Sequence, residues 1–300
     1  MTSISIWLAA FRLRTLPLSL SSILMGSFLA QSQQKLDINI FLLAILTTIF
    51  LQILSNLAND YGDFVNGADT DKREGEARMV VSGKIKPLQM KNAIIIFSFL
   101  SFFSGLSLLL IAVKTWEIFW FFLGLGLLCI IAAITYTVGK RPYGYMGLGD
   151  IAVFLFFGIV GVGGTYYLHT QSIDLKILLP ASACGFLATG VLNLNNMRDI
   201  NTDILAGKKT IPTRLGRENA NIYHIFLLIM SVLCMVLYVF FVYQQWSQWL
   251  FLLILPLIYK NISVVLRTKI NKDLDPYLKQ LALTSLLLVI LFGLSNFILF

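Results

Sequence analysis

Long apolar segments recur along the whole chain and are separated by polar connections. Each segment is continuously apolar and does not alternate between polar and apolar positions, so helices are favoured over the strands of a barrel. A run of about 18 or more apolar residues is long enough to cross a bilayer as a helix. We expect nine such spans, at residues 15–33, 39–58, 92–113, 117–137, 150–168, 175–194, 222–242, 248–266 and 281–300. The pattern therefore predicts an all-α polytopic membrane protein, with residues 1–300 in a single domain.

Composition agrees with this class. Hydrophobic residues make up 57% of the 300 residues and charged residues only 13%, whereas soluble domains carry roughly 25% charged residues. The mean hydropathy is +0.80, which excludes a soluble helical bundle. The N-terminus does not resemble a cleavable signal peptide, because Trp7, Arg12 and Arg14 break the order of a charged, an apolar and a small-residue region.

The positive charges are unevenly placed. Of the 23 Lys and Arg residues, all except Lys35, Lys114 and Lys176 lie in the N-terminal arm and in alternate loops between spans. This imbalance is typical of cytoplasmic loops in multi-pass proteins of the cell inner (cytoplasmic) membrane. We therefore expect the N-terminus and the two long loops to be cytoplasmic and the C-terminus to lie outside. The net charge of +8 follows from this topology, so we expect no nucleic-acid partner. The oligomeric state stays open.

Two polar segments follow the second and the sixth span. The first acidic segment, "NLANDYGDFVNGAD" (56–69), and the second acidic segment, "NNMRDINTDILAGKKT" (195–210), both combine Asn and Asp at helical spacing. Because residues three or four apart share one face of a helix, the side chains should form a polar stripe at each span end. These stripe residues are Asn56, Asn59, Asp60 and Asp63 in the first segment and Asn195, Asp199 and Asp203 in the second. The weak similarity of the two segments is compatible with an internal duplication but does not by itself establish one.

Carboxylates beside an apolar interior are costly unless a positive charge neutralises them. Oxygen donors without neighbouring His or Cys favour a hard divalent ion such as Mg²⁺, which usually binds phosphate oxygens as well. Basic residues of the same loops, among them Arg78, Arg198 and Lys208, would complete a site for a diphosphate whose tail lies in the membrane. A single acidic run after a span is more often a solvated loop, and this interpretation holds for residues 71–76. Two runs at one membrane face favour a functional site, in a central cavity that opens to the cytoplasmic side.

The connection "TYTVGKRPYGYMGLGD" (135–150) carries four glycines and the aromatic residues Tyr136, Tyr143 and Tyr145. Such a loop allows backbone and ring faces to approach a flat substrate ring. Lys140 and Arg141 either lie beside the diphosphate or serve only as topology charges.

The cysteines and histidines lie away from the acidic segments. Cys129, Cys184 and Cys234 fall in separate apolar spans, where we expect them to pack as small apolar side chains. We expect structural roles for His169 and His224.

Taken together, the two acidic segments, "GYMGLGDIAVFLFFG" (144–158) and the nine spans resemble the UbiA-type intramembrane prenyltransferases over essentially the whole chain. Within that family the residues are most similar to the subgroup whose acceptor is 1,4-dihydroxy-2-naphthoate. The sequence departs from the pattern at Leu13, where the family commonly has proline, and at Asp150, where the subgroup usually has glutamate.

The resemblance implies roles for individual residues. It implies Mg²⁺ ligands at Asn59, Asp60, Asp63, Asp69, Asn195, Asp199 and Asp203. It implies binding of the diphosphate and the acceptor by Arg14, Asn59, Arg78, Asp150, Asn195, Arg198 and Lys208. It implies catalytic roles for Asp63, Asp69, Tyr136, Lys140, Arg141, Asp199 and Asp203. The implied substrates are a polyprenyl diphosphate, whose tail occupies a tunnel open to the lipid bilayer, and 1,4-dihydroxy-2-naphthoate, which loses CO₂.

Two alternatives stay open. A sister enzyme would use 4-hydroxybenzoate, homogentisate or another acceptor with the same donor site. A cation- or proton-coupled secondary transporter would also place acids in membrane helices, but near mid-membrane on broken helices. Here the acids lie at span ends on one side only, which favours the enzyme.

Overall fold

The computed structural model describes residues 3–67, 78–242 and 245–295, and every regular element in these ranges is helical. The N-terminal half contains α1 (Ser3–Phe11), η1 (Leu13–Thr15), α2 (Leu16–Gln31), α3 (Ile38–Val65), α4 (Pro87–Ala112), α5 (Trp116–Thr135) and η2 (Tyr143–Met146). The middle contains α6 (Gly149–Val153), the π-helix η3 (Phe154–Gly164), α7 (Thr165–Thr170) and η4 (Leu175–Ile177). The C-terminal half contains α8 (Leu178–Arg198), α9 (Ile200–Leu205), α10 (Ile211–Val242), η5 (Trp246–Ile254), α11 (Leu255–Arg267), η6 (Asn271–Leu274) and α12 (Asp275–Leu294).

Nine helical segments within the described ranges are long and apolar enough to cross a membrane, which confirms the predicted number. Two boundaries differ from the prediction in an informative way. Helix α3 continues to Val65, so Asn59, Asp60 and Asp63 belong to the helix itself. Helix α12 begins at Asp275, several residues before the expected start at 281, because its polar first turns have partners inside the bundle. Asp275 accepts a hydrogen bond from Arg198, and Gln280 accepts one from Asn261.

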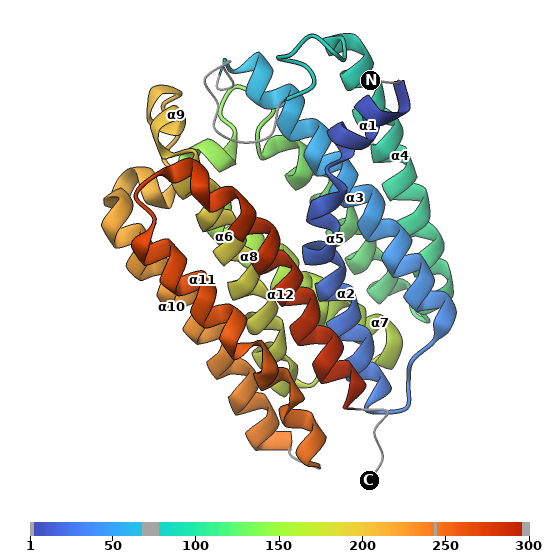
Figure 1. The fold of residues 1–300 in the computed structure, drawn as a ribbon. Helices are drawn as coiled ribbons and strands as arrows, with labels where there is room; N and C mark the ends of the chain where they lie inside the picture. The colour runs from blue at the N-terminus through green and yellow to red at the C-terminus, as the bar shows by residue number, and fades with distance from the viewer. Residues whose placement is uncertain (1–2, 68–77, 243–244, 296–300) are drawn as a thin grey trace.

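The helices form two groups that α2 joins. Helix α8 packs against α10, η3 and α12, while α3 packs against α4 and α5. Helix α2 contacts α3, η3 and α12 and so lies between the groups (Figure 1). The start of α1 and the end of α12 lie at opposite ends of the bundle (Figure 1).

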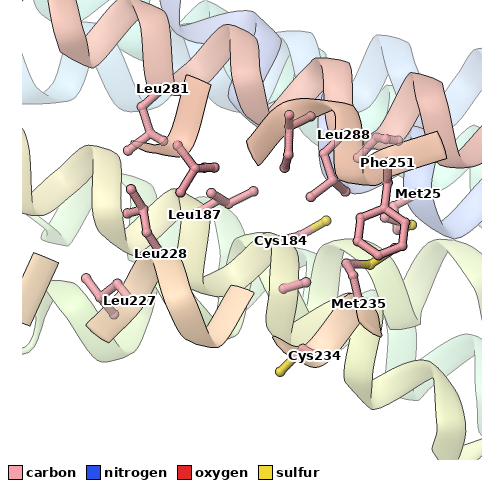
Figure 2. Close-up of a cluster of buried hydrophobic side chains, with 14 of the residues drawn as sticks. Met25, Cys184, Leu187, Leu227, Leu228, Cys234, Met235, Phe251, Leu281 and Leu288 are labelled. Atoms are coloured by element: carbon pink, nitrogen blue, oxygen red, sulfur yellow. The ribbon is translucent and has the colours of Figure 1, made fainter. Parts of the chain in front are cut away.

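The largest cluster of buried apolar side chains lies in the C-terminal group. Its core contains Leu187, Met235, Phe251 and Leu288, each with no solvent exposure, and Cys184 and Cys234 pack there as expected (Figure 2). Helices in a membrane associate mainly through close packing, which small residues permit. A Cβ atom at Gly158 would lie 2.6 Å from the carbonyl oxygen of Ala181. The π-helix η3 is thereby held directly against α8.

Candidate active site

The two acidic segments meet at one end of the bundle. The C-terminal end of α3 and the junction of α8 with α9 both lie at the end where α1 begins (Figure 1). Between them is a cavity of about 220 Å³, here called the polar cavity. Its lining includes the predicted site residues Arg14, Asn59, Asp63, Arg78, Tyr136, Asn195, Asp199, Asp203 and Lys208. Residues that the chain separates widely therefore face one space.

Asp63 is the centre of the first acidic segment. Its carboxylate accepts hydrogen bonds from Arg78 Nη2 (2.7 Å) at Oδ2 and from the Tyr145 hydroxyl (2.6 Å) at Oδ1. Lys208 Nζ lies 3.2 Å from the same Oδ1. Asp63 is only 2% exposed. Because hydrogen bonds from charged donors are strong and short, these partners hold the buried carboxylate in place.

The approach of α3 to the loop after α5 depends on a glycine. A Cβ atom at Gly62 would lie 2.6 Å from the carbonyl oxygen of Thr137, closer than any real side chain permits. The Thr137 hydroxyl donates to the Asn59 side chain at 3.1 Å. Gly62 therefore allows the helix end that carries Asn59 and Asp63 to lie directly against the loop.

Asp60 lies outside the lining of the polar cavity. Its two carboxylate oxygens accept hydrogen bonds from the backbone N–H groups of Met79 (2.9 Å) and Val80 (3.2 Å), and the side chain is buried. These contacts support a positioning role, since they anchor the segment that carries Arg78. The geometry does not favour Asp60 as a metal ligand.

Arg198 is the centre of the second acidic segment and is 1% exposed. Its Nε and Nη2 donate to the two oxygens of Asp199, both at 2.8 Å. Nη2 also donates to Asn195 Oδ1 at 2.8 Å, and Nη1 donates to Asp275 on α12. Asp275 in turn pairs with Arg14 Nη1 at 3.3 Å. The guanidinium thus links α8, α9 and α12 at the edge of the polar cavity.

Tyr145 and Lys208 connect the two segments. Lys208 Nζ contacts Asp63 and also lies 3.5 Å from Asp203 Oδ1. It lies 4.6 Å from the centre of the Tyr145 ring. The backbone N–H of Lys209 donates to the Tyr145 carbonyl oxygen at 2.9 Å. The loop after α5 is therefore fastened to both acidic segments.

Several predicted site residues lie elsewhere. Lys140 and Arg141 are exposed and line neither the polar cavity nor the apolar chamber described below, which favours their interpretation as topology charges. Asp150 is buried and accepts a hydrogen bond from the Tyr223 hydroxyl at 3.3 Å. It lines neither the polar cavity nor the apolar chamber. Asp69 lies outside the described residues.

Sequence reasoning did not assign Tyr145 or Asp275 to the site. Tyr145 had a signal, because it is one of three tyrosines in a glycine-rich loop beside two basic residues. Asp275 had none, since an Asp-Pro pair after a basic stretch is typical of a turn. Further polar side chains of the polar cavity outside the assigned set are Arg12, Thr15, Gln52, Asn56, Thr137, Asn196, Thr210 and Lys279.

A second cavity of about 390 Å³, here called the apolar chamber, lies among α2, α3, α4, α5 and η3. It shares Asn59, Tyr136 and Phe157, among others, with the polar cavity, so the two spaces lie side by side. Desolvation, with a further contribution from nearby carboxylates, raises the pKa of Tyr136 far above its usual value. Desolvation also raises the pKa of Tyr143 to about 12. Both phenols are therefore neutral, Tyr136 at the boundary of the two spaces and Tyr143 in the wall of the apolar chamber.

This arrangement matches a family of known sequences. The model of the UbiA prenyltransferase family matches residues 19–296 of the chain. The chain belongs to this family. A polar cavity bordered by two acidic segments and adjacent to an apolar chamber is thus the candidate active site of a UbiA-family prenyltransferase, an integral multi-pass membrane protein.

Relatives and solved structures agree with the membership. The chain is 46% identical to a 1,4-dihydroxy-2-naphthoate octaprenyltransferase of Haemophilus influenzae, with 97% of this chain and 96% of that protein covered. It is 47% identical to the enzyme of the same name from Escherichia coli, with 97% and 95% covered. A UbiA homolog from Aeropyrum pernix shares the fold with a TM-score of 0.68 at 18% identity, over 95% of this chain and 97% of the other. A UbiA homolog from Archaeoglobus fulgidus, bound to DMAPP and Mg²⁺, has a TM-score of 0.61 at 18% identity, with 96% and 99% covered.

The residues of this UbiA-family site fit a magnesium ion. Carboxylate and amide oxygens are the donors that Mg²⁺ prefers, and one or two carboxylates usually suffice when substrate phosphates complete the shell. Asp63 and Asp203 lie close enough that one ammonium nitrogen contacts both. In residues 3–67, 78–242 and 245–295, no group of three or more His, Cys, Asp or Glu forms a metal cluster. The carboxylate pair that the Lys208 ammonium group bridges is the best-supported position for a divalent ion in its place.

Proposed function

We propose that this protein transfers a polyprenyl group from a polyprenyl diphosphate to 1,4-dihydroxy-2-naphthoate, with loss of CO₂ and diphosphate, and so forms demethylmenaquinol for menaquinone biosynthesis. One observation supports the reaction class: a cavity of carboxylates and cations shares part of its wall with an apolar chamber. The acceptor is proposed from the relatives that are 46% and 47% identical and carry that name.

The polar cavity suits the diphosphate group. Arg14, Arg78 and Lys208 line it and supply positive charge for the phosphate oxygens. Mg²⁺, when bound by Asp63, Asp203 and the neighbouring oxygen donors Asn59, Asn195 and Asp199, would neutralise charge on the same group. These side chains lie at helix ends, so the charged group need not enter the apolar part of the bundle.

The apolar chamber suits the isoprenoid tail. It lies among helices whose apolar side chains, such as Leu106, Leu123 and Phe156, form its wall. With the diphosphate in the polar cavity, the tail passes Tyr136 and Phe157, which line both spaces. The allylic carbon that reacts is then placed at this boundary.

The chemistry proceeds at that boundary. The bond between the allylic carbon and the diphosphate oxygen breaks, and the bonding electrons leave with the diphosphate. Arg78 and Lys208 stabilise the charge that develops there, which is where preorganised cations lower a barrier most. The allylic cation attacks the electron-rich naphthoate ring at its carboxylated carbon, and the new carbon–carbon bond replaces the bond to CO₂. The neutral ring of Tyr136 stabilises the cation through its face and excludes water.

We further propose that the polar cavity opens toward the cytoplasm, in the inner membrane of the cell. The charge imbalance of the loops supports this orientation, since basic loops stay on the cytoplasmic side.

The test is an acceptor screen with the purified protein in nanodiscs. With Mg²⁺, octaprenyl diphosphate and 1,4-dihydroxy-2-naphthoate, we expect release of pyrophosphate and CO₂ in equal amounts. EDTA should stop the reaction and added Mg²⁺ should restore it. Turnover with only 4-hydroxybenzoate or homogentisate would replace the proposed acceptor, and an EDTA-resistant reaction would contradict the role of the metal.

The carboxylates are tested in the same assay. Asp63→Asn and Asp199→Asn keep the shape of the side chain but remove its charge, and each should abolish measurable turnover while the protein stays folded. Full turnover in both variants would contradict the proposed site.

A further inference from the structure

Lys208 lies where two negative groups face each other. Its Nζ atom is 3.2 Å from Asp63 Oδ1 on α3 and 3.5 Å from Asp203 Oδ1 on α9. The side chain is 14% exposed and lies over the ring of Tyr145. The next residue, Lys209, has an exposed side chain, although its backbone is fixed to Tyr145. Two lysines that are adjacent in the chain therefore lie in different environments.

The ammonium group of Lys208 relieves a specific repulsion. Two buried carboxylates that face each other destabilise one another, and the effect is strong where water is largely excluded. A single positive charge in contact with both cancels most of this repulsion. The position between the two carboxylates is also the one that a hard divalent ion would take.

Lys208 and a metal ion cannot share that position. An ammonium group carries only hydrogen-bond donors, so it does not coordinate a metal, and its charge repels the ion. The lysine side chain is long and flexible, and it extends from the connection between α9 and α10, next to Gly207 in a left-handed conformation (φ 70°). Its head can therefore move within the polar cavity while the backbone stays in place.

We propose that Lys208 is an internal counter-ion: it occupies the cation position between Asp63 and Asp203 in the metal-free enzyme and transfers to the diphosphate when metal and substrate bind. This inference rests on the proposed function, because it requires a metal–diphosphate pair as the ligand. The metal displaces the ammonium group from the carboxylates, and the phosphate oxygens provide its new partner.

The consequence is coupling between the two ligands. Metal alone must displace Lys208 from two carboxylates and leaves it without an equivalent anion, so metal alone binds weakly. A diphosphate compensates for this loss, so it should strengthen metal binding, and by reciprocity the metal should strengthen diphosphate binding. The enzyme would thus keep its acidic site stable before loading and favour loading of both ligands together.

The experiment measures metal binding directly and does not depend on turnover. The full chain in nanodiscs is titrated with Mn²⁺, followed by electron paramagnetic resonance, with and without inorganic pyrophosphate. Radiolabelled pyrophosphate that stays with the nanodiscs reports the second ligand. The variants are Lys208→Met, which keeps the length but not the charge, Lys208→Arg, which keeps the charge, and Lys209→Met as the matched control.

We expect wild-type protein to bind Mn²⁺ weakly alone and roughly 5- to 150-fold more tightly with pyrophosphate, the usual range of coupling between two sites. Lys208→Met should bind Mn²⁺ alone at least about tenfold more tightly than wild type, a gain within that range, and should retain less pyrophosphate. Lys208→Arg and Lys209→Met should stay close to wild type in Mn²⁺ binding without pyrophosphate. Opposite changes for the two ligands distinguish a counter-ion from a residue that only supports the fold, which would weaken both.

Two results overturn the inference. If Lys208→Met binds Mn²⁺ no more tightly than wild type, the lysine does not compete with the metal, and the proposed function stands provided that wild-type turnover is observed in the same nanodiscs. If wild-type protein binds no Mn²⁺ even with pyrophosphate and shows no turnover, the metal–diphosphate site fails together with the inference. Should Lys208→Met not fold, an increase of Mn²⁺ affinity in Lys208→Arg would contradict the proposal instead.

Discussion

Each acidic segment contributes a buried aspartate to an ion pair with an arginine, but the two ion pairs are formed differently. In the first, the carboxylate of Asp63 is the centre, and its partners Arg78, Tyr145 and Lys208 come from three other parts of the chain. In the second, the guanidinium of Arg198 is the centre, and it contacts Asp199, Asn195 and Asp275. Asp63 thus accepts hydrogen bonds from two cations and a hydroxyl group, whereas Arg198 donates to two carboxylates and an amide oxygen.

The two ion pairs differ in how far apart their members lie in the chain, and therefore in how much each pair depends on tertiary contacts. Arg198 and Asp199 are adjacent in the chain, so their contact forms as soon as the end of α8 forms. Arg78 reaches Asp63 across 15 positions, and the segment that carries it is anchored by Asp60 through the backbone of Met79 and Val80. The first acidic segment is therefore assembled by tertiary contacts and should tolerate the loss of one partner. The second concentrates its contacts in one side chain and should not.

Replacing each of the two arginines separately is the strongest test of this difference. Arg198→Met leaves the carboxylates of Asp199 and Asp275 without their shared partner, and removal of one member of a buried ion pair costs about 3–5 kcal/mol. Arg78→Met should cost clearly less, since Asp63 retains Tyr145 and Lys208. Thermal unfolding in detergent micelles measures both variants. Equal losses of stability would show that the two segments do not differ in this respect.

The anchoring role of Asp60 predicts a somewhat smaller effect. Asp60→Asn keeps one acceptor oxygen but loses the charge that faces two backbone N–H groups, and hydrogen bonds to charged groups contribute about 1.5–3 kcal/mol. Because Arg78 then moves relative to Asp63, we expect the KM for the polyprenyl diphosphate to rise more than kcat falls. A fall in kcat at unchanged KM would instead assign Asp60 to the reaction itself.

Tyr145 tests whether the link between the segments matters for function. Tyr145→Phe removes the hydroxyl that donates to Asp63 but keeps the ring beneath Lys208. Loss of a partner that orients a metal ligand typically costs about 10- to 100-fold in activity or metal affinity, and we expect the lower end because Asp63 keeps its arginine. The measurement is the Mg²⁺ concentration that gives half-maximal turnover. Tyr143→Phe, in the same loop, is the matched control.

The smallest effect is expected at the exposed pair of the same loop. Lys140 and Arg141 line neither the polar cavity nor the apolar chamber, and surface substitutions usually change stability by less than about 0.5 kcal/mol. The double change Lys140→Gln and Arg141→Gln should therefore alter turnover by no more than about twofold. A large loss of turnover would instead assign Lys140 and Arg141 to the active site.

Sequence patterns predicted most of what depends on local spacing. Apolar runs of membrane length gave the nine spans, and the helical spacing of Asn59 with Asp63 and of Asn195 with Asp199 predicted their common face. Spacing alone failed for Asp60, which shares a helix with Asp63 but points to the backbone of another segment. The start of α12 was placed too late because the polar residues Asp275 and Gln280 were assigned to a loop, although partners inside the bundle stabilise them.

By itself, the sequence determined that the described part of this chain contains nine helical segments long and apolar enough to cross a membrane, with acidic segments at the ends of the second and the sixth, because the thickness of a bilayer and the period of a helix act on consecutive residues. Only the tertiary structure decided which groups meet in the polar cavity. Lys208 reaches Asp63 across 145 positions, and Arg198 reaches Asp275 across 77. Such contacts depend on how whole helices pack, and helix packing follows from the summed fit of many side chains that no short pattern contains.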